Sequence, residues 1–389
     1  MGLFGYIKRY SGIFLADVAT SIGLYYLWNK GHKYLVPTVS LCGIGVSYLC
    51  CRLKSRDNLT SNDVIVITGC GSGLGYSLAL HCRQLGATVI AGVLQMESPA
   101  VQKLEDEGVI VYPLDLMELN STTAFTDSVR RTIAEKKLVL RCVINNAAVM
   151  VFGEFEWQTY GQLKNQLEVN FLGALIVTQE LMPIIRAHYS RIIVVSSHCK
   201  TQPIPGASVY SGTKAAISAW ATGLRVELKK YGIRVVCVVP GSFIRESNIF
   251  TRQADHFEAM KWVMPKEAQN FYGEYLYRYM KYFTSLVKNT TVQTVRDGRI
   301  YEIFEGALLD RYPSATYKNE SWRYAIYHTL FTITPTFLRD RLVERFVHAP
   351  AWTKEDAVRS VSYAQKAMNG LYERCPFEVF SKVYNDNRF

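Results

Sequence analysis

The run Thr68-Gly69-Cys70-Gly71-Ser72-Gly73-Leu74-Gly75 lies between a β-branched stretch, residues 64–67, and residues 76–85, which we expect to be helical. Glycines at such a strand-to-helix turn let the backbone turn tightly and approach a phosphate group at the helix N-terminus. The flanking strand and helix make the motif more specific than a glycine-rich turn alone. The run therefore predicts a dinucleotide-binding turn, with Cys70 as a bystander and Gly71 as an additional loop glycine.

Short apolar runs alternate with helical segments through the following sequence. After the first run they occupy residues 88–93, 109–112, 139–144, 191–195 and 234–239. Apolar runs of this length between helices indicate a parallel sheet covered on both faces. We therefore predict an α/β fold with a Rossmann-type, doubly wound parallel sheet. From residue 243 to about 283 the regular alternation gives way to an aromatic-rich region, and another helix is expected near residues 295–309.

The N-terminal region contains two apolar stretches, residues 11–28 and 34–51, each about 18 residues long and close to the minimum for crossing a bilayer. Basic residues flank both stretches. They predict a membrane anchor over residues 1–56, as one transmembrane helix (the second stretch) or as a helical hairpin. For the hairpin, the positive-inside rule places the main domain in the cytoplasm. The alternative is a pair of helices buried in a soluble fold.

Composition argues against a nucleic-acid-binding protein and against a fold held by disulfides or cysteine-bound metal. The net charge of +11 is spread along the chain without a long Lys/Arg run, so we expect no nucleic-acid partner. The nine cysteines include no C-x-x-C pair and fall mostly in apolar runs, which favours buried thiols over disulfides or a cysteine metal site. We predict no metal ligands.

A second motif supplies acid–base chemistry. Tyr210 and Lys214 are four residues apart, which places them on one face of a helix. A neighbouring ammonium group favours the phenolate and lowers the pKa of the phenol from its usual value of about 10. Ser197, thirteen residues before Tyr210, follows a predicted strand, and its hydroxyl is suited to hold a substrate oxygen.

Together these motifs, T-G-x-x-x-G-x-G and Y-x-x-x-K with the spaced serine, resemble those of short-chain dehydrogenases. The resemblance implies that Asn170 anchors a water in a proton relay to Lys214. It also implies that Asp115 meets the adenine amino group, that Asn145 shapes the cofactor wall and that Pro240-Gly241 passes under the nicotinamide. The expected catalytic residues are Asn170, Ser197, Tyr210 and Lys214, and the expected cofactor-binding residues are Gly69, Ser72, Gly73, Leu74, Gly75, Asp115, Asn145, Tyr210, Lys214, Pro240 and Gly241.

Two positions depart from the family pattern. Ala148 stands where the family has glycine in N-N-A-G, and Arg245 stands where it often has a threonine that holds the carboxamide. Ser242 and Ser247 are candidate substitutes for that threonine. These departures motivate a competing hypothesis, a catalytically weak membrane-bound binding or scaffold protein on the same fold.

Residues 91–94 after the second strand and, late in the chain, residues 311–313, Tyr317, Trp322 and residues 334–338 resemble the retinol dehydrogenase and 17β-hydroxysteroid dehydrogenase (type 2-like) branch. This resemblance implies an oxidoreductase that interconverts a lipophilic alcohol and its ketone or aldehyde, with a 3-hydroxybutyrate-type dehydrogenase as the alternative. NAD is the expected cofactor and NADP the second choice, because residues 94–96 after the second strand offer no cation for a 2′-phosphate. The substrate wall is expected from aromatic residues: Phe243, Phe250, Phe257, Trp262, Phe271, Tyr272, Tyr275 and Tyr277.

These expectations define the organisation of the chain. Residues 57–350 form the predicted catalytic domain, with residues 243–290 as a substrate lid and residues 351–389 as a C-terminal tail. We expect a membrane-bound protein, with the endoplasmic reticulum as the favoured compartment and the mitochondrial membrane as the alternative. The expected partners are the lipid membrane and the lipophilic substrate, and a homodimer is the assembly we consider.

Overall fold

A computed structural model describes residues 18–32, 35–53, 55–241, 248–286, 294–320, 322–347 and 349–357. Its centre is one seven-stranded sheet with the order β3-β2-β1-β4-β5-β6-β7, in which all neighbouring strands are parallel. The strands are β1 (Asp63–Thr68), β2 (Thr88–Val93), β3 (Ile110–Pro113), β4 (Val139–Asn145), β5 (Arg191–Val195), β6 (Arg234–Val239) and β7 (Thr316–Lys318). The order reverses between β1 and β4, which is where doubly wound sheets bind their ligands.

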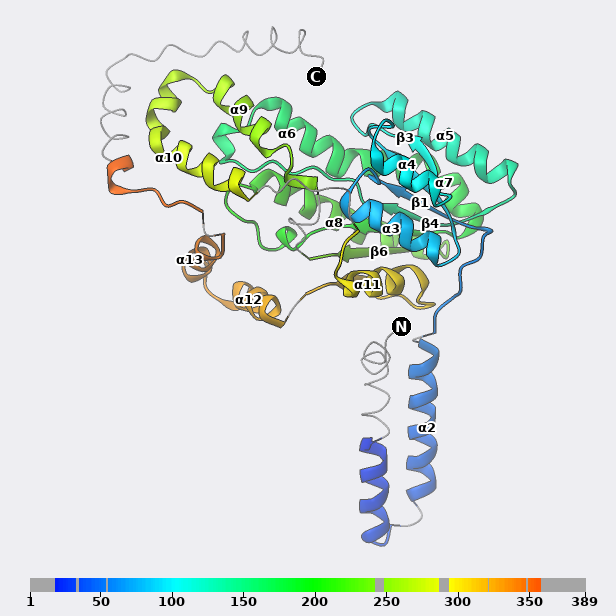
Figure 1. Ribbon diagram of the computed structural model, residues 1–389. Helices are drawn as coiled ribbons and strands as arrows, with labels where there is room; N and C mark the ends of the chain where they lie inside the picture. Colours follow the sequence, from blue (N-terminus) through cyan, green and yellow to red (C-terminus); the bar gives the residue numbers. More distant parts are fainter. Residues whose placement is uncertain are drawn as a thin grey trace.

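Helices cover both faces of the sheet (Figure 1). One face packs against α3 (Gly73–Gln84), α4 (Pro99–Asp106) and α11 (Gly298–Leu309). The other packs against α5 (Leu119–Glu135), α7 (Gly173–His188) and α8 (Ser208–Lys229). Buried aliphatic side chains such as Ile65 and Val66 point alternately to the two cores, so the strands are apolar on both faces. The predicted Rossmann-type fold is confirmed.

The edge strand β7 and the helices of the aromatic-rich region were not predicted from the sequence. The edge strand β7 is only three residues long and contains Lys318, so it lacks the apolar run that marks the other strands. The aromatic-rich region, for which no regular structure was predicted, contains η5 (Asn248–Phe250), α9 (Gln253–Val263) and α10 (Lys266–Ser285). The helical spacing was present: the buried residues of α10 are Tyr272, Tyr275, Leu276, Tyr279 and Phe283.

The remaining elements surround the ends of the sheet. Between β4 and α7 lie η2 (Phe155–Trp157), α6 (Tyr160–Leu167) and a π-helical turn, η3 (Glu168–Leu172). The short helix η4 (His198–Lys200) follows β5. After β7 come α12 (Trp322–Ile333) and α13 (Thr336–Val347).

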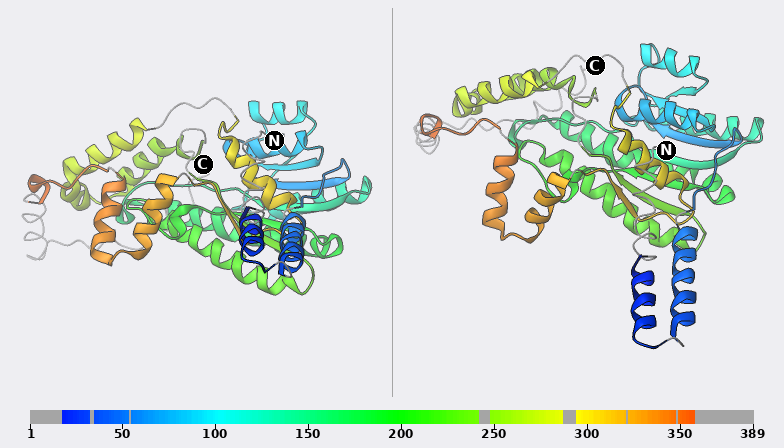
Figure 2. Two further views of the ribbon diagram at one scale, coloured as in Figure 1. Left: turned by 90° about the horizontal axis from the view of Figure 1, so that it is seen from below. Right: turned by 60° about the horizontal axis from the view of Figure 1, so that its bottom comes forward.

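Two N-terminal helices project from the domain side by side (Figures 1 and 2). They are residues 18–29 and α2 (Val36–Leu53). A Cβ atom at Gly43 would be 3.0 Å from the Oγ1 atom of Thr20, so the small residue allows the two helices to approach closely. Their outer surfaces carry apolar side chains such as Tyr25, 71% exposed, and Leu41, also 71% exposed.

Length and hydropathy identify one described helical run that could span a bilayer, Tyr160–His188. This run is α6, η3 and α7, and its residues Val177 and Leu181 are fully buried in the core of the domain. It is therefore a core helix. The apolar part of α2 identified in this way, Val36–Val46, is shorter. Residues 1–17, which include the start of the first predicted apolar stretch, lie outside the described residues.

Candidate active site

The glycine-rich turn has the backbone geometry that only glycine adopts without strain. Gly69 has a φ of +74° and Gly73 a φ of +56°. A Cβ atom at Gly69 would lie 2.7 Å from the Cα atom of Ala147, and one at Gly75 would collide with the carbonyl oxygen of Gly69. Beside Gly71, by contrast, a Cβ atom would meet nothing within 4 Å. The turn is therefore closely packed on one side and open on the other.

The turn leads directly into the N-terminus of a helix. Helix α3 begins at Gly73 with Ser72 as its N-cap, and the Ser72 side chain makes no capping hydrogen bond. The first N–H groups of the helix, at Gly73, Leu74 and Gly75, are thus suited to receive a pyrophosphate. This cradle of glycines at the β1/β4 switch point fits a dinucleotide cofactor.

Two residues that sequence reasoning did not single out hold this turn in place. The Asn146 side chain donates to the carbonyl oxygens of Thr68 (2.9 Å) and Gly69 (3.3 Å). The hydroxyl oxygen of Thr68 accepts from the backbone N–H groups of Asn146 and Ala147, both at 3.1 Å. These bonds connect the ends of β1 and β4. The threonine before the first glycine and the second asparagine of Asn145-Asn146 were the available signals.

Asn145 is buried, and its side chain turns toward α7. Its amide donates to the hydroxyl of Thr178 at 2.9 Å, while its Oδ1 atom is buried without a hydrogen-bond partner among the described residues. Asp115 follows β3 and accepts from the backbone N–H of Met117 at 2.9 Å. Asp115 is not the N-cap of α5, since Glu118 occupies that position.

Pro240 and Gly241 directly follow β6 at the carboxyl edge of the sheet. Gly241 has a φ of +93°, and a Cβ atom there would lie 2.9 Å from the carbonyl oxygen of Asn319. Glycine is therefore needed at this turn. Arg245, Ser242 and Ser247 lie outside the described residues, so their roles in holding the carboxamide stay predictions.

The predicted acid–base pair lies on α8. Tyr210 is 8% exposed and Lys214 is 2% exposed, and the Nζ atom of Lys214 lies 5.8 Å from the centre of the Tyr210 ring. The Lys214 ammonium donates to the carbonyl oxygen of Val195, at the end of β5, at 3.0 Å. Ser197 follows this strand, and its hydroxyl oxygen accepts from the backbone N–H of Cys199 at 3.2 Å. The structure thus brings Ser197, Tyr210 and Lys214 together.

Burial changes the pKa of both Tyr210 and Lys214. It raises the pKa of Tyr210 above its ordinary value, and nearby Cys199 adds to this effect, while a side-chain hydrogen bond with Ser197 opposes it. Burial also lowers the pKa of Lys214 to about 8, and Cys237 and Cys199 oppose that change. In the chain alone Tyr210 is therefore a protonated acid. To act as a base it needs positive charge nearby.

Asn170 lies in the π-helical turn η3 and is 1% exposed. Its Oδ1 atom accepts from the backbone N–H of Val149 (2.7 Å), and its amide donates to the Val149 carbonyl (2.8 Å) and to the Thr213 hydroxyl (3.1 Å). These contacts connect the loop after β4 to α8 beside Lys214. Both amide hydrogens are used by the protein, so the predicted water would have to be held by another atom.

The expected substrate wall is largely a buried cluster. Phe250, Phe257, Tyr272 and Tyr275 pack in one apolar core with Tyr210. Trp262 is 88% exposed and Tyr277 is 61% exposed, so these two side chains are not enclosed by the described residues. Phe243 lies outside those residues. The pocket role of the buried aromatic residues stays a prediction.

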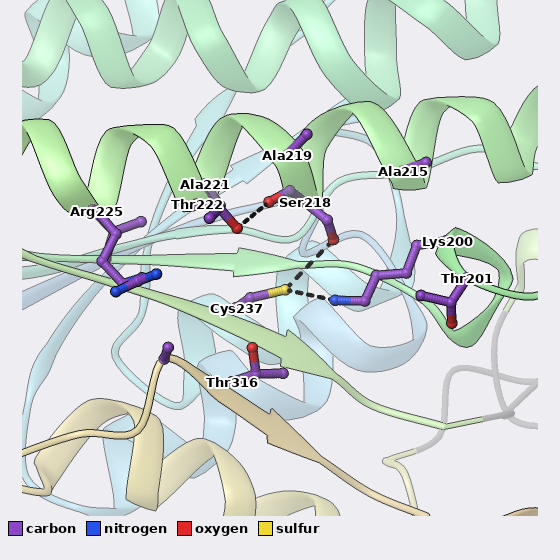
Figure 3. Close-up of a pocket in the computed structure, with 12 residues that line it drawn as sticks. Lys200, Thr201, Ala215, Ser218, Ala219, Ala221, Thr222, Arg225, Cys237 and Thr316 are labelled. Carbon is purple, nitrogen blue, oxygen red and sulfur yellow. Dashed lines mark hydrogen bonds between the residues drawn. The ribbon is translucent and has the colours of Figure 1, made fainter. Parts of the chain in front are cut away.

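A separate cavity of about 300 Å³ lies between α8 and the β6–β7 edge of the sheet (Figure 3). In it the Sγ atom of Cys237 is 3.8 Å from the Lys200 ammonium and 3.7 Å from the Ser218 hydroxyl. Thr222, Arg225 and Thr316 also line it. None of the predicted site residues lines this cavity, so it is distinct from the candidate active site.

Hydride exchange with a dinucleotide needs a pyrophosphate site and an acid–base group within reach of the substrate oxygen. Because the strands are parallel, the glycine turn after β1 and Ser197 after β5 lie at the same edge of the sheet, and α8 places Tyr210 beside that edge. Fold and site together are suited to a nicotinamide dinucleotide and to proton exchange with a substrate oxygen.

Comparisons with known proteins agree with this interpretation of the fold and the site. Residues 63–255 match the family model of short chain dehydrogenases. The chain is 32% identical to estradiol 17-beta-dehydrogenase 2 of Rattus norvegicus, over 62% of this chain and 64% of that protein. It is 28% identical to D-beta-hydroxybutyrate dehydrogenase, mitochondrial, of Mus musculus (56% and 66%) and to retinol dehydrogenase 7 of Rattus norvegicus (72% and 87%). The match therefore spans slightly less than two thirds of the length of the estradiol and hydroxybutyrate dehydrogenases.

A solved short-chain dehydrogenase from Streptomyces avermitilis has the same fold, with a TM-score of 0.53 and 21% identity, over 72% of this chain and 96% of that one. The chain belongs to the short-chain dehydrogenase family, in the branch that contains estradiol, retinol and hydroxybutyrate dehydrogenases.

Proposed function

We propose that this protein is a membrane-attached dehydrogenase that interconverts a steroid- or retinoid-like alcohol and its carbonyl form with NAD. One observation carries the choice of substrate: Tyr210 is a member of a buried, aromatic-rich cluster that includes Met150, Phe152 and Tyr279. Two tyrosines of the cluster, Tyr272 and Tyr275, donate to the carboxylates of Glu156 and Glu154, and carboxylates beside the cluster disfavour the anion of a small hydroxy acid. An apolar surrounding with few polar groups suits a large lipophilic alcohol.

A polar anchor for such a substrate is present in the cluster. Tyr279 is 2% exposed, and its hydroxyl oxygen has no hydrogen-bond partner among the described residues. A Cβ atom added at Gly206 would collide with this hydroxyl, which places Tyr279 beside the turn that leads into α8. Because a buried hydroxyl is costly without a partner, a polar group of the substrate is a suitable partner for it.

The chemistry follows from the catalytic set. Bound NAD supplies the hydride acceptor for alcohol oxidation. Ser197 holds the substrate oxygen, Tyr210 takes the hydroxyl proton during oxidation and returns it during reduction, and Lys214 stabilises the phenolate form of Tyr210. Asn170 positions the loop after β4 against α8 through Val149 and Thr213.

Substrate class is tested with the purified full chain in detergent, by comparing kcat/KM for estradiol, retinol and 3-hydroxybutyrate with NAD. We expect a lipophilic alcohol to be preferred by about 100-fold or more, because aromatic surroundings suit a large apolar substrate and the neighbouring Glu154 and Glu156 disfavour an anion. Activity restricted to 3-hydroxybutyrate would refute the substrate assignment and leave the dehydrogenase assignment intact.

Cofactor selectivity is expected to favour NAD. The residues after β2 are Leu94, 65% exposed, Gln95, and Met96, 38% exposed, and none of them can pair with a 2′-phosphate. Ser72 also offers no charge. We expect kcat/KM to be about 10- to 100-fold higher with NAD than with NADP. The reverse order in steady-state kinetics would show that a cation elsewhere in the chain reaches the phosphate.

Membrane attachment is supported by two apolar surfaces. The N-terminal helices present Ile22 and Leu41, 64% and 71% exposed, on the outside of their hairpin. Helices α12 and α13 lie on the side of the domain from which this hairpin projects (Figures 1 and 2), with Trp322 72% exposed and Phe337 64% exposed. Exposed apolar surface of this extent is typical of a partner or lipid contact. We propose the endoplasmic reticulum membrane as the location.

Removal of residues 1–56 is expected to release most of the protein from the membrane. The truncated chain keeps α12 and α13, so a weak association that is lost in carbonate should remain. The measurement compares carbonate-extracted membrane fractions of the full and truncated chains. Recovery of the full-length protein in the soluble fraction without detergent would show that the two helices belong to the soluble fold.

A further inference from the structure

Three side chains that the proposed reaction does not use meet at one place beside the catalytic serine. His198 follows Ser197 at the end of β5, Glu320 follows β7, and His328 lies on α12. Their side chains are 21%, 17% and 16% exposed. One ligand atom from each residue lies within 4.8 Å of the other two. Three segments that are distant in sequence therefore bring two imidazoles and one carboxylate together.

The two histidines face the same carboxylate oxygen. The Nδ1 atom of His328 contacts the Oε1 atom of Glu320, and the Nδ1 atom of His198 lies 3.9 Å from it. The two imidazole rings are tilted by 31° with centroids 4.4 Å apart. A hydrogen bond with Glu320 accounts for the position of one histidine, His328. The second imidazole lies close to the same oxygen, and two imidazoles beside one carboxylate give the donor set of a binding site for a cation.

A histidine–glutamate pair elsewhere in the chain shows what the third residue adds. The Nε2 atom of His81 lies 3.1 Å from the Oε1 atom of Glu305, and their side chains are 20% and 22% exposed. Arg56 completes the surroundings of Glu305 at 2.7 Å. This pair has nearly the same exposure but has an arginine where the other cluster has a second histidine, so it has no place for a metal ion.

We propose that His198, Glu320 and His328 bind one divalent transition-metal ion, with Zn²⁺ as the ion that the donors fit best. Two imidazole nitrogens and one carboxylate oxygen are a ligand set that zinc accepts, whereas Ca²⁺ and Mg²⁺ prefer sites made of oxygen donors. Three protein ligands leave a further position for water.

The ion would join α12 to the turn that carries Ser197. A direct link exists already: the Gln202 side chain donates to the His328 carbonyl oxygen at 3.4 Å, and the backbone N–H of Gln202 donates to the His198 carbonyl oxygen at 3.2 Å. With the metal bound, η4 and α12 would be held together by coordinate bonds as well. The role of the ion is therefore to fix the C-terminal helices against the catalytic edge of the sheet.

The test uses the full chain in detergent, purified without a histidine tag and stripped with a chelator. Zn²⁺ binding is measured by competition with a chromophoric chelator, and Co²⁺ binding by its visible absorption. We expect one ion per chain and a higher thermal unfolding temperature with Zn²⁺. Absence of stoichiometric binding to the wild-type chain would overturn the proposal without affecting the dehydrogenase assignment.

Matched variants locate the site. His328→Ala and Glu320→Gln are expected to weaken Zn²⁺ binding by more than about 100-fold, since even residues behind metal ligands contribute 10- to 100-fold. His81→Ala, in the matched histidine–glutamate pair, should leave the affinity unchanged. Circular dichroism of the metal-free proteins checks that each variant is folded. Unchanged affinity in His328→Ala, or an equal loss in His81→Ala, would show that the ion binds elsewhere.

Discussion

Tyr210→Phe is expected to lower kcat for alcohol oxidation by about 100- to 10,000-fold, the usual contribution of a general acid–base group. Phenylalanine keeps the ring in the apolar cluster and removes only the hydroxyl that exchanges the proton. Binding of NADH, followed by its fluorescence, should change little, because the glycine turn and α3 are unaffected. Tyr301→Phe is the control: its hydroxyl donates to the Val295 carbonyl at 2.8 Å, so it loses a hydroxyl outside the candidate site.

The pH dependence of the wild-type rate gives a second measure of the same group. Burial raises the pKa of Tyr210, so the phenolate that oxidation requires becomes more abundant as pH rises. Oxidation should therefore accelerate with pH, and the rise should weaken as Lys214, with a pKa of about 8, loses the charge that supports the phenolate. The residual rate of Tyr210→Phe should lack this rise. A variant with near wild-type turnover would contradict the assignment.

Gly75→Ala is expected to weaken NADH binding by about 100-fold, the scale of effect for a displacement of about 1 Å in a site. The new Cβ atom would collide with the Gly69 carbonyl oxygen and would lie 2.5 Å from the Nδ2 atom of Asn146, so the turn would have to open. That opening would also break the hydrogen bond from Asn146 to Gly69.

Gly71→Ala is the matched control in the same turn. A Cβ atom there meets nothing within 4 Å, and Gly71 has no positive φ. NADH affinity should stay within a few-fold of wild type, and the free energy of unfolding should change by less than about 0.5 kcal/mol. Equal affinity in Gly75→Ala and wild type would show that the cofactor does not depend on this turn.

The sheet could be predicted from sequence because its strands are buried on both faces. Residues 88–93, 191–195 and 234–239 were predicted with the bounds that the structure has. The predicted bounds of β1 and β3 differ by one residue at both ends, and those of β4 by one residue at the C-terminal end. The proximity of Tyr210 and Lys214 could be predicted because the two residues are one helical turn apart. In both cases the signal lies in neighbouring residues.

Features that depend on contacts between distant residues could not be predicted in this way. Thr68 and Asn146 hold the glycine turn only because β1 and β4 are adjacent in the sheet. The cluster around Glu320 requires α12 to pack beside η4, which no local pattern shows. The helices α9 and α10 were missed for another reason: their aromatic composition obscured a helical period that was present in the sequence.

The most direct test of a dehydrogenase that acts on a lipophilic alcohol is the transfer of a labelled hydride. Estradiol carrying deuterium on its C17 carbinol carbon is incubated with NAD and the full chain, and the NADH formed is analysed by mass spectrometry. The account predicts one deuterium in each NADH, one estrone for each NADH, and almost no product with Tyr210→Phe. Binding of estradiol and NAD without labelled NADH, for estradiol and for equally labelled retinol, would contradict the account and indicate a binding protein on this fold.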